Sequence, residues 1–468
     1  MTYTNNRKEK IMSILAAVAV PHPPIILPQV GKGEEQKIIN TISAYRQAMN
    51  FLKDYAPETI IIISPHTTVY ADYFHISPGT VAHGDFARFN APQVSETVEY
   101  DTEFVQTLEQ VCVEQNFPCG TKGEQMPELD HGTLIPLHFW HQAGGKCKIL
   151  RIGLSGLSLL HHYKLGQLLK EVAEKLNRRT VIIASGDLSH KLLAEGPYGF
   201  AAEGPEFDKE ITKMLGSADF AAMLEMSPQL CDAAGECGHR AFVIMAGALD
   251  SKAVKANLLS YEGPFGVGYG VATFTITGDD EKRNFGVQFA EKLQKQREKE
   301  DIYVQLARRT VEYFVQTGLT PPDVPPLPQE MLLERAGAFV SLKKRGQLRG
   351  CIGTIAPVQS SLALEIMRNA VSACSQDPRF MPVRIDELSE LVYSVDVLKP
   401  AEPVNSIEEL DAKKYGVIVE NGGRRGLLLP DIEGVETPEE QIAIAKQKGG
   451  ILPHEEVQLF RFEVIRHK

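Results

Sequence analysis

The sequence lacks three features that would place the protein on a membrane, on nucleic acid or outside the cell. No apolar run approaches the roughly 18 residues that a membrane-spanning helix needs, so we expect no contact with a membrane. Basic residues are in deficit, with 49 Lys and Arg against 60 Asp and Glu and a formal net charge of -11, which argues against nucleic acid as a partner. The seven cysteines show no spacing typical of a disulfide framework, which indicates a reducing compartment and predicts a cytoplasmic protein.

One short apolar segment near the start imitates a secretory signal. Basic residues at positions 7–10 are followed by an apolar run over residues 11–20. The run is short and rich in valine and alanine, and it ends just before His22, a residue that the predicted site requires. We therefore predict a retained β-strand over residues 13–20.

The length of 468 residues predicts two or three domains. Through residue 277, short β-branched runs alternate with amphipathic stretches, the pattern of βαβ units around a mostly parallel sheet. Apolar residues at helical spacing predict crossover helices over residues 38–52 and 165–176. We expect an α/β domain over residues 1–277, with helices flanking central strands over residues 13–20, 59–63, 148–152 and 180–184.

A charged stretch separates this domain from the rest of the chain. Residues 278–297 are rich in charged side chains and are expected to form a linker or a solvated helix. A smaller α+β domain is expected over residues 298–468, beginning with a helical stripe over 303–314 and an extended proline-rich stretch over 321–328. Its other predicted elements are a helix over 361–375 and strands over 338–342, 391–398, 416–419 and 457–465.

Three histidines follow three of the predicted central strands. His22, His66 and His190 each lie shortly after such a strand, and His131 lies in a loop between polar neighbours and an apolar run. In open α/β sheets, ligands bind outside the carboxyl ends of the strands. Each histidine alone is more typical of a capping or core residue, but their common placement predicts that four imidazoles converge.

Converging imidazoles predict a metal site. Imidazole nitrogen binds Fe, Zn, Cu and Ni, and two histidines with one carboxylate are typical of non-haem Fe(II) oxygenases. Residues 235–239 offer two candidates for the third ligand, the carboxylate of Glu236 and the thiol of Cys237. Ligation by Cys237 would shift the preferred metal toward Cu or Zn, and a buried, unreactive thiol is the alternative interpretation of this cysteine.

The motifs around these residues resemble those of the class III extradiol ring-cleavage dioxygenases of the LigB type and of the related Memo-like proteins. The resemblance covers roughly residues 13–277 and rests on four motifs, at residues 21–24, 64–66, 130–132 and 185–190. It implies that His22 and His66 bind a metal, and that His131 and His190 act in catalysis or lie next to the ligands.

The same resemblance leaves the third ligand open. Ring-cleaving members complete the site with a glutamate, which would be Glu236, whereas Memo-like members carry a cysteine in a Cys-Gly context that matches Cys237-Gly238 better. With Fe(II), the resemblance implies an oxidoreductase that holds a small aromatic substrate and O2 side by side, with His190 taking a proton from the substrate and His131 assisting. A Zn-dependent hydrolase and a binding or assembly module without turnover are the alternatives.

The second domain has one distinctive motif, in which two glycines flank Cys351 directly after Arg349. A neighbouring Arg349 would lower the pKa of the thiol and make Cys351 a nucleophile or a ligand. In the alternative interpretation, which we favour slightly, the cysteine is buried and the glycines form a bulge. Asp377 and Arg379 form a second polar cluster and are expected to pair, so these four residues make a second candidate site.

Together with residues 335–340 and 387–388, these motifs resemble the AMMECR family over roughly residues 298–468. The two domains together resemble the AmmeMemoRadiSam system protein A family. The family name implies a radical S-adenosylmethionine protein as a separate partner, because the present sequence has no Cys-x3-Cys-x2-Cys motif for an iron-sulfur cluster.

Overall fold

The computed structural model describes residues 13–322, 326–344, 346–432 and 434–468. The chain divides into two compact units between Ala290 and Glu291, and each is described here by itself. The basic residues at positions 7–10 that imitate a signal lie outside the described residues. Among the described residues, no helix combines the length and the apolar character needed to cross a membrane.

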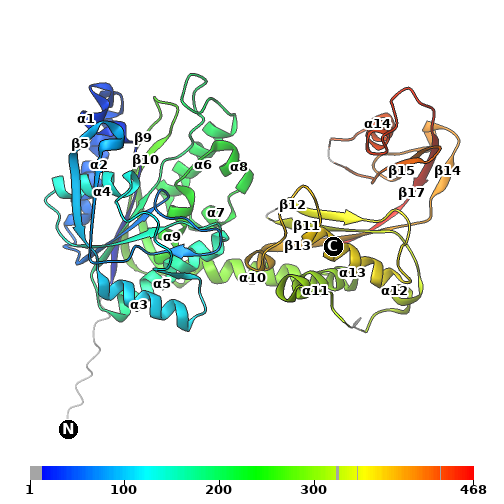
Figure 1. The fold of residues 1–468 in the computed structure, drawn as a ribbon, viewed down its shortest axis with the longest axis horizontal. Coiled ribbons are helices and arrows are strands. Elements are labelled where there is room, and N and C mark those ends of the chain that lie inside the picture. Colours follow the sequence, from blue (N-terminus) through cyan, green and yellow to red (C-terminus); the bar gives the residue numbers. More distant parts are fainter. Residues whose placement is uncertain (1–12, 323–325, 345, 433) are drawn as a thin grey trace, which may run out of the picture. The chain divides into compact units, whose positions relative to one another are not determined.

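The first unit, which runs from blue to green in Figure 1, is built around one six-stranded sheet whose strand order is β7-β2-β8-β1-β10-β9. Its first four strands are parallel, and β10 and β9 are antiparallel additions at one edge. All four predicted central strands are confirmed, and the mostly parallel α/β architecture with them. The strand bounds are β1 Ile14–Val20, β2 Thr59–Ser64, β7 Lys148–Gly153, β8 Thr180–Ser185, β9 Lys252–Glu262 and β10 Tyr269–Asp279.

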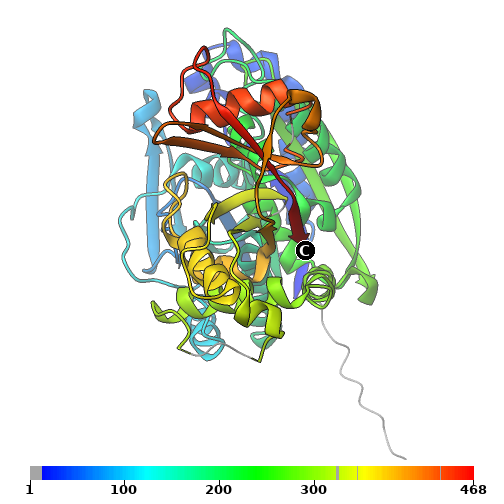
Figure 2. The same ribbon diagram turned by 90° about the vertical axis from the view of Figure 1, so that its right-hand side faces the viewer.

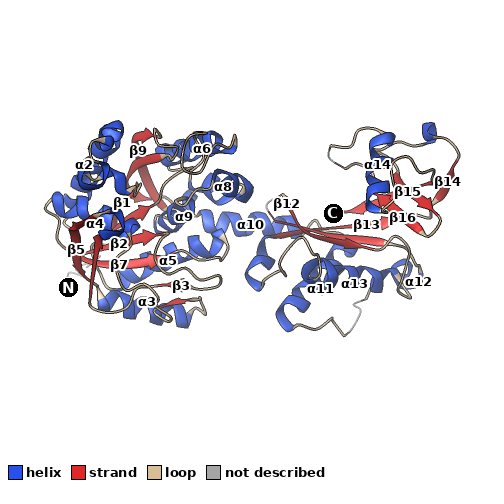
Figure 3. Cartoon of the chain, turned by 45° about the horizontal axis from the view of Figure 1, so that its top comes forward, coloured by secondary structure: helices blue, strands red, loops and turns tan. Residues whose placement is uncertain are grey.

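Helices cover both faces of this sheet (Figure 3). Two apolar clusters pack against this sheet, one on each face. Ala16 and Val18 of β1 belong to the first cluster and Ala17 and Ala19 to the second, because successive strand residues point to opposite faces. The first cluster includes α2 (Ile39–Lys53) and α4 (His131–Gln142), and the second includes α3 (Thr102–Glu114), α5 (Leu159–Lys175), α6 (Glu203–Ser217), α7 (Phe220–Glu225) and α9 (His239–Ala248).

The two predicted crossover helices are present, but α5 begins six residues earlier than its apolar stripe suggests. The side chain of Ser158 accepts a hydrogen bond from the backbone N–H of His161 and caps the helix ahead of Leu159. The other α-helices and strands of this unit are α1 Pro28–Gly31, α8 Pro228–Ala234, β3 Phe74–His75, β4 Val81–Phe86, β5 Ala91–Glu99 and β6 Cys119–Gly120.

The charged stretch that follows β10 is helical over most of its length. Helix α10 (Phe285–Arg297) contains no fully buried residue, which agrees with its charged composition. In the second unit, α11 (Ile302–Thr317) and α13 (Leu362–Ser375) pack with a four-stranded sheet of order β12-β11-β13-β18. Residues 323–325 of the predicted proline-rich stretch lie outside the described residues.

A second four-stranded sheet, β14-β17-β15-β16, is covered by α14 (Pro438–Lys448) on one face, as Figures 1 and 2 show. The α+β architecture is therefore confirmed. The single strand predicted over residues 457–465 is wrong, because the chain leaves one sheet for the other at Glu463 and forms two strands. The bounds are α12 Gln329–Leu333, β11 Ala338–Lys344, β12 Gln347–Gly353, β13 Leu391–Leu398, β14 Glu402–Val404, β15 Gly416–Asn421, β16 Arg424–Leu428, β17 Gln458–Phe462 and β18 Val464–His467.

A partly buried carboxylate connects β5 to α4, the helix that begins at His131. The Nδ1 atoms of His138 and His141 lie 2.9 and 2.5 Å from the two carboxylate oxygens of Glu96. Burial raises the pKa of Glu96, but the two imidazoles outweigh it and lower the value from 4.5 to about 2. The carboxylate therefore contributes stability above pH 4.5 that is lost as the pH falls through about 2.

Replacing this carboxylate predicts a measurable, pH-dependent loss of stability. We expect Glu96→Gln to lower the free energy of unfolding at pH 7 by about 1 to 2 kcal/mol, since solvent partly screens the carboxylate, with the deficit shrinking between pH 4.5 and 2. Urea unfolding followed by the fluorescence of Trp140, the only tryptophan, measures the effect in the same helix. Glu99→Gln, at an exposed position of the same strand, is the control, and equal losses in the two variants would contradict the assignment.

Candidate functional site

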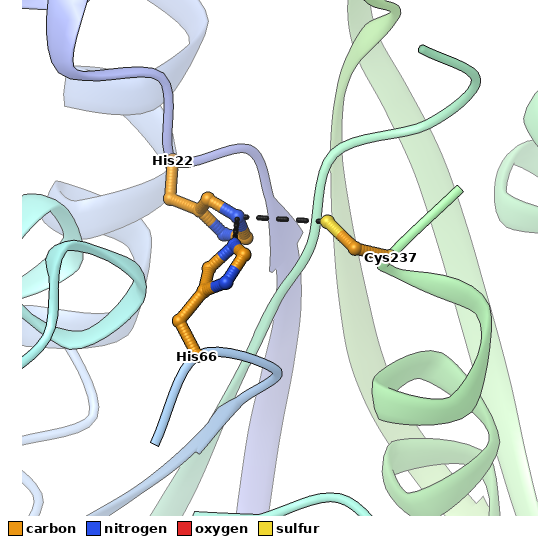
Figure 4. A group of neighbouring side chains, drawn as sticks. All are labelled: His22, His66 and Cys237. Atoms are coloured by element: carbon orange, nitrogen blue, oxygen red, sulfur yellow. Dashed lines mark hydrogen bonds between the residues drawn. The ribbon is translucent and has the colours of Figure 1, made fainter. Parts of the chain in front are cut away.

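Side chains from distant parts of the first unit meet at the carboxyl ends of its parallel strands. His22 follows β1 by two residues, His66 follows β2 by two residues, and Cys237 lies just before the start of α9. Figure 4 shows the three side chains pointing toward one another from separate elements. The edge of the sheet at which they meet is the one where ligands of open α/β folds bind.

The donor atoms of these three residues are close enough to share one ion. The Nε2 atoms of His22 and His66 are 2.9 Å apart, and the Sγ of Cys237 lies 3.6 Å from Nε2 of His22. All three donor atoms lie within 4.8 Å of one another. A tetrahedral ion with metal–sulfur and metal–nitrogen bonds of about 2.3 and 2.0 Å would hold sulfur and nitrogen about 3.5 Å apart, so the spacing fits a thiolate-imidazole site.

Hydrogen bonds fix the ring of His22 with one nitrogen facing the centre. Its Nδ1 lies 2.9 Å from Oγ of Ser185, and its backbone N–H donates to Oδ1 of Asp187 at 2.7 Å. Burial, followed by the neighbouring histidines, lowers the pKa of His22 well below its ordinary value. The ring is therefore neutral at pH 7, as a metal-binding imidazole must be.

The other two predicted histidines border this group. His131 is the first residue of α4, and its ring stacks on that of His66 with centroids 4.2 Å apart and lies 5.3 Å from that of His22. Burial and the nearby His66 lower the pKa of His131 to about 4. His190, beyond β8, packs against Tyr198 at 5.1 Å, and burial also lowers its pKa. Both imidazoles are therefore neutral at pH 7.

The structure separates the two candidates for the third ligand. Cys237 joins the histidines, whereas the carboxylate of Glu236 belongs to a different group with Cys231 and His239. One oxygen of Glu236 accepts the backbone N–H of His239 at 2.6 Å, at the first turn of α9. Because neighbouring residues of the segment face different groups, Glu236 does not lie among the donors around His22.

Cys237 reaches His22 because two glycines allow β8 and α9 to meet closely. A side-chain carbon added at Gly186 would stand 2.1 Å from the Cα of Gly238, a distance that no pair of carbons tolerates. The close contact places the backbone N–H of Asp187 3.3 Å from Sγ of Cys237, to which it donates. Both positions therefore need glycine for the thiol to reach the site.

Asp187 is a site residue that the sequence analysis missed. Its carboxylate accepts the backbone N–H of His22 and its own N–H donates to Cys237, so it connects two of the three donors. Burial raises its pKa to about 7, despite the opposing hydrogen bond from His22. Asp187 could have been predicted as a site residue from its place directly after a buried strand, in the motif at residues 185–190 from which only His190 was selected.

A buried arginine holds the segment that leads into His131. Arg151, on β7, has no exposed surface and donates to the carbonyls of Glu128 at 2.8 Å and Met126 at 2.7 Å. Asp130, the cap of α4, accepts the hydroxyl of Ser64 at 2.5 Å. Arg151 could not be recognised from the sequence, because it stands alone in an apolar strand where only packing was expected.

The candidate residues of the second unit form two separate polar contacts. Arg349 pairs with Glu387, with Nε 2.8 Å from the carboxylate, and donates to the carbonyl of Met381. Burial raises the pKa of Cys351, so the thiol is not activated in the way that an adjacent Arg349 would require. The four residues thus supply no acidic thiol.

Asp377 and Arg379 do pair, and together they cover an edge strand. Asp377 accepts the backbone N–H of Cys351 at 2.9 Å, and Arg379 donates to the carbonyl of the same residue at 3.1 Å. These are the bonds that a further strand would make with β12, so the pair closes this edge of the sheet.

Comparison with known proteins agrees with both units. The family model for the catalytic LigB subunit of aromatic ring-opening dioxygenase matches residues 16–272, more than half of the chain. The chain belongs to the LigB family. A second family model, AMMECR1, matches residues 304–467 of this LigB-family chain.

Similar proteins cover either nearly all of this chain or about a third of it. A Clostridium acetobutylicum protein is 39% identical over 98% of the LigB-family chain and 100% of its own length. A Thermotoga maritima protein is 55% identical over 36% of the chain and 97% of its own length. The crystal structure of a Pyrococcus horikoshii protein is 31% identical and covers 36% of this chain and 90% of that one, with a TM-score of 0.34.

The orientation of His22 leads to a test of the site. Ser185→Ala removes the partner of Nδ1, so we expect metal affinity to fall about 10- to 100-fold, the usual effect of losing such a hydrogen bond. Competition with a chromogenic chelator measures the affinity. Ser95→Ala, at an exposed serine of β5, is the control, and an affinity unchanged by Ser185→Ala would contradict the role of Ser185 in orienting His22 as a ligand.

Proposed function

We propose that the first unit is a metal-dependent oxidoreductase of the extradiol dioxygenase type, acting on a small aromatic diol with O2. The observation that carries the proposal is the group of His22, His66 and Cys237, with donor atoms within 4.8 Å of one another at the ligand-binding edge of the sheet. Membership of a family described by aromatic ring opening supports the reaction type. Fe(II) is the metal expected for this chemistry.

The residues present fit a metal. Two neutral imidazoles and one thiol meet, and the hydrogen bond between His22 and Ser185 leaves Nε2 of His22 turned to the centre. Burial raises the pKa of the Cys237 thiol well above its usual value, so a cation is required to hold the thiolate. When bound, Fe(II) supplies adjacent positions at which a diol and O2 can be held together.

The side chains around the metal ligands would transfer protons and exclude water. His190 is neutral at pH 7 and is the base that accepts a proton from a diol hydroxyl. His131, stacked on His66, is held by the helix cap at Asp130 and presents its ring to the same space. Burial of His22 and the ring of Phe89, 5.6 Å from His131, limit the access of water to this region.

Zinc-dependent hydrolysis is the second candidate, and one observation favours it. The third donor is a thiol and not the carboxylate of Glu236, and thiolates favour Zn and Cu over the harder Fe(II). Two histidines and one cysteine with an open fourth position would then activate water. A binding role without turnover, a radical S-adenosylmethionine partner and a cytoplasmic location stay predictions of the sequence.

The proposal predicts that metal binding and oxygen consumption are lost together. After anaerobic reconstitution with Fe(II), we expect the protein to take up oxygen in the presence of one or more members of a panel of catechols. His22→Ala and His66→Ala should each reduce the iron bound at this site and the oxygen uptake by more than about 10-fold, because each removes a metal–ligand bond and not merely a hydrogen-bond partner of a ligand. Bound iron is measured by elemental analysis and oxygen by an electrode.

His83→Ala, at an exposed histidine of the same unit, is the matched control. Oxygen uptake that survives in His22→Ala would contradict the proposed site. If no catechol is consumed but zinc-loaded protein hydrolyses esters in a manner that requires Cys237, the hydrolase replaces the oxidoreductase.

A further inference from the structure

A second group of potential metal ligands lies beside the first, separated from it by one peptide unit. Cys231 is a buried residue of α8, Glu236 lies in the segment between α8 and α9, and His239 is the first residue of α9. One donor atom from each lies within 4.8 Å of the others. Among the described residues, this group and the one around His22 are the two in which one donor atom from each of three His, Cys, Asp or Glu side chains lies within 4.8 Å of the others.

The ring of His239 is oriented as in a metal-binding histidine. Its Nε2 lies 2.8 Å from the carbonyl oxygen of Met223, so this nitrogen carries the proton and donates it. The lone pair of Nδ1 is then directed at the Sγ of Cys231, 3.6 Å away. A backbone carbonyl on the remote nitrogen is the usual partner of a histidine ligand, and 3.6 Å is close to the sulfur–nitrogen spacing of about 3.5 Å in a tetrahedral zinc site.

An acidic pocket formed by α6, α7 and α8 would attract cations to this part of the unit, although none of the three ligands lines it. Its volume is about 550 Å3, and it is lined by Glu203, Glu206, Glu210 and Glu225 together with Leu230, the neighbour of Cys231. Such a concentration of negative charge raises the local concentration of divalent ions. Cys231 and His239 are 8% and 2% exposed, whereas Glu236 keeps partial contact with solvent, so an ion would enter past the carboxylate.

We infer that Cys231, Glu236 and His239 form a second metal site, for Zn2+ or a divalent ion of similar softness. The three ligands comprise one thiolate, one carboxylate and one imidazole, a set that zinc accepts. On binding, the thiol of Cys231 releases its proton to solvent and the imidazole stays neutral, so no electron transfer is involved. The inference does not rest on the dioxygenase activity.

The position of this site gives it a structural role for the first. Glu236 would bind the second ion while Cys237, the next residue, reaches the group around His22. An ion held by Glu236 and by residues of α8 and α9 would fix the segment that carries Cys237. The second ion would thus position a ligand of the first without contacting the substrate.

Cobalt titration can count the two sites, because each contains a single cysteine. Metal-free full-length protein is titrated anaerobically with Co2+, and thiolate-to-cobalt absorption in the near ultraviolet is recorded. We expect two equivalents per chain. Cys231→Ser and Cys237→Ser should each remove one equivalent and about half of the thiolate absorption, since one of the two thiolates is lost in each.

Two further variants keep the test decisive. If the group binds metal, His239→Gln should remove one equivalent of Co2+, as Cys231→Ser does. Circular dichroism shows whether each variant folds, and His239→Gln replaces Cys231→Ser if the latter does not. Cys147→Ser, at a partly buried cysteine outside both groups, should leave two equivalents.

The inference would be overturned if the natural protein bound one equivalent of Co2+ and only Cys237→Ser abolished the absorption, with Cys231→Ser and His239→Gln leaving it unchanged. Cys231, Glu236 and His239 would then serve only to stabilise the start of α9 by hydrogen bonds. If the absorption depended on Cys231 alone, the second site would be supported, and the group around His22 would bind no metal, which contradicts the proposed oxidoreductase. The two proposals therefore fail in distinguishable ways.

Discussion

The site depends on the close approach of two backbone segments, the end of β8 and the start of α9. Gly186 and Gly238 allow a contact that any side chain would prevent, and Asp187 and Cys237 are carried with them. His22 is then held from two sides, by Ser185 and Asp187 of the strand end and by contact with Cys237. A thiol from the loop before a helix thereby joins imidazoles that follow two parallel strands.

Burial sets the chemistry of this group. In a desolvated site the neutral form of an imidazole and of a thiol is favoured, as the lowered pKa of His22 and the raised pKa of Cys237 show. A bound cation reverses the second effect by stabilising the thiolate. In the second unit no comparable convergence appears among the candidate residues, whose polar contacts instead close the edge of a sheet at Cys351.

Much of the fold followed from local patterns, and much of the site did not. Apolar runs bounded by turn residues located the four parallel strands, and the rule that ligands bind at strand ends brought His22 and His66 into view. The choice between Glu236 and Cys237 required three dimensions, because adjacent residues in a turn can face different groups. Asp187 could have been found from its place directly after a buried strand, whereas Arg151 acts through backbone carbonyls and full burial, which leave no signature in the sequence. The break at Glu463 was missed because both halves of the segment are strand-like.

X-ray absorption at the iron edge of protein reconstituted anaerobically with Fe(II) tests the central claim most directly, since it reports only the atoms bound to iron. The account predicts imidazole nitrogen together with one sulfur at about 2.3 Å, and loss of that sulfur in Cys237→Ser. A coordination sphere of nitrogen and oxygen alone in the natural protein would contradict it.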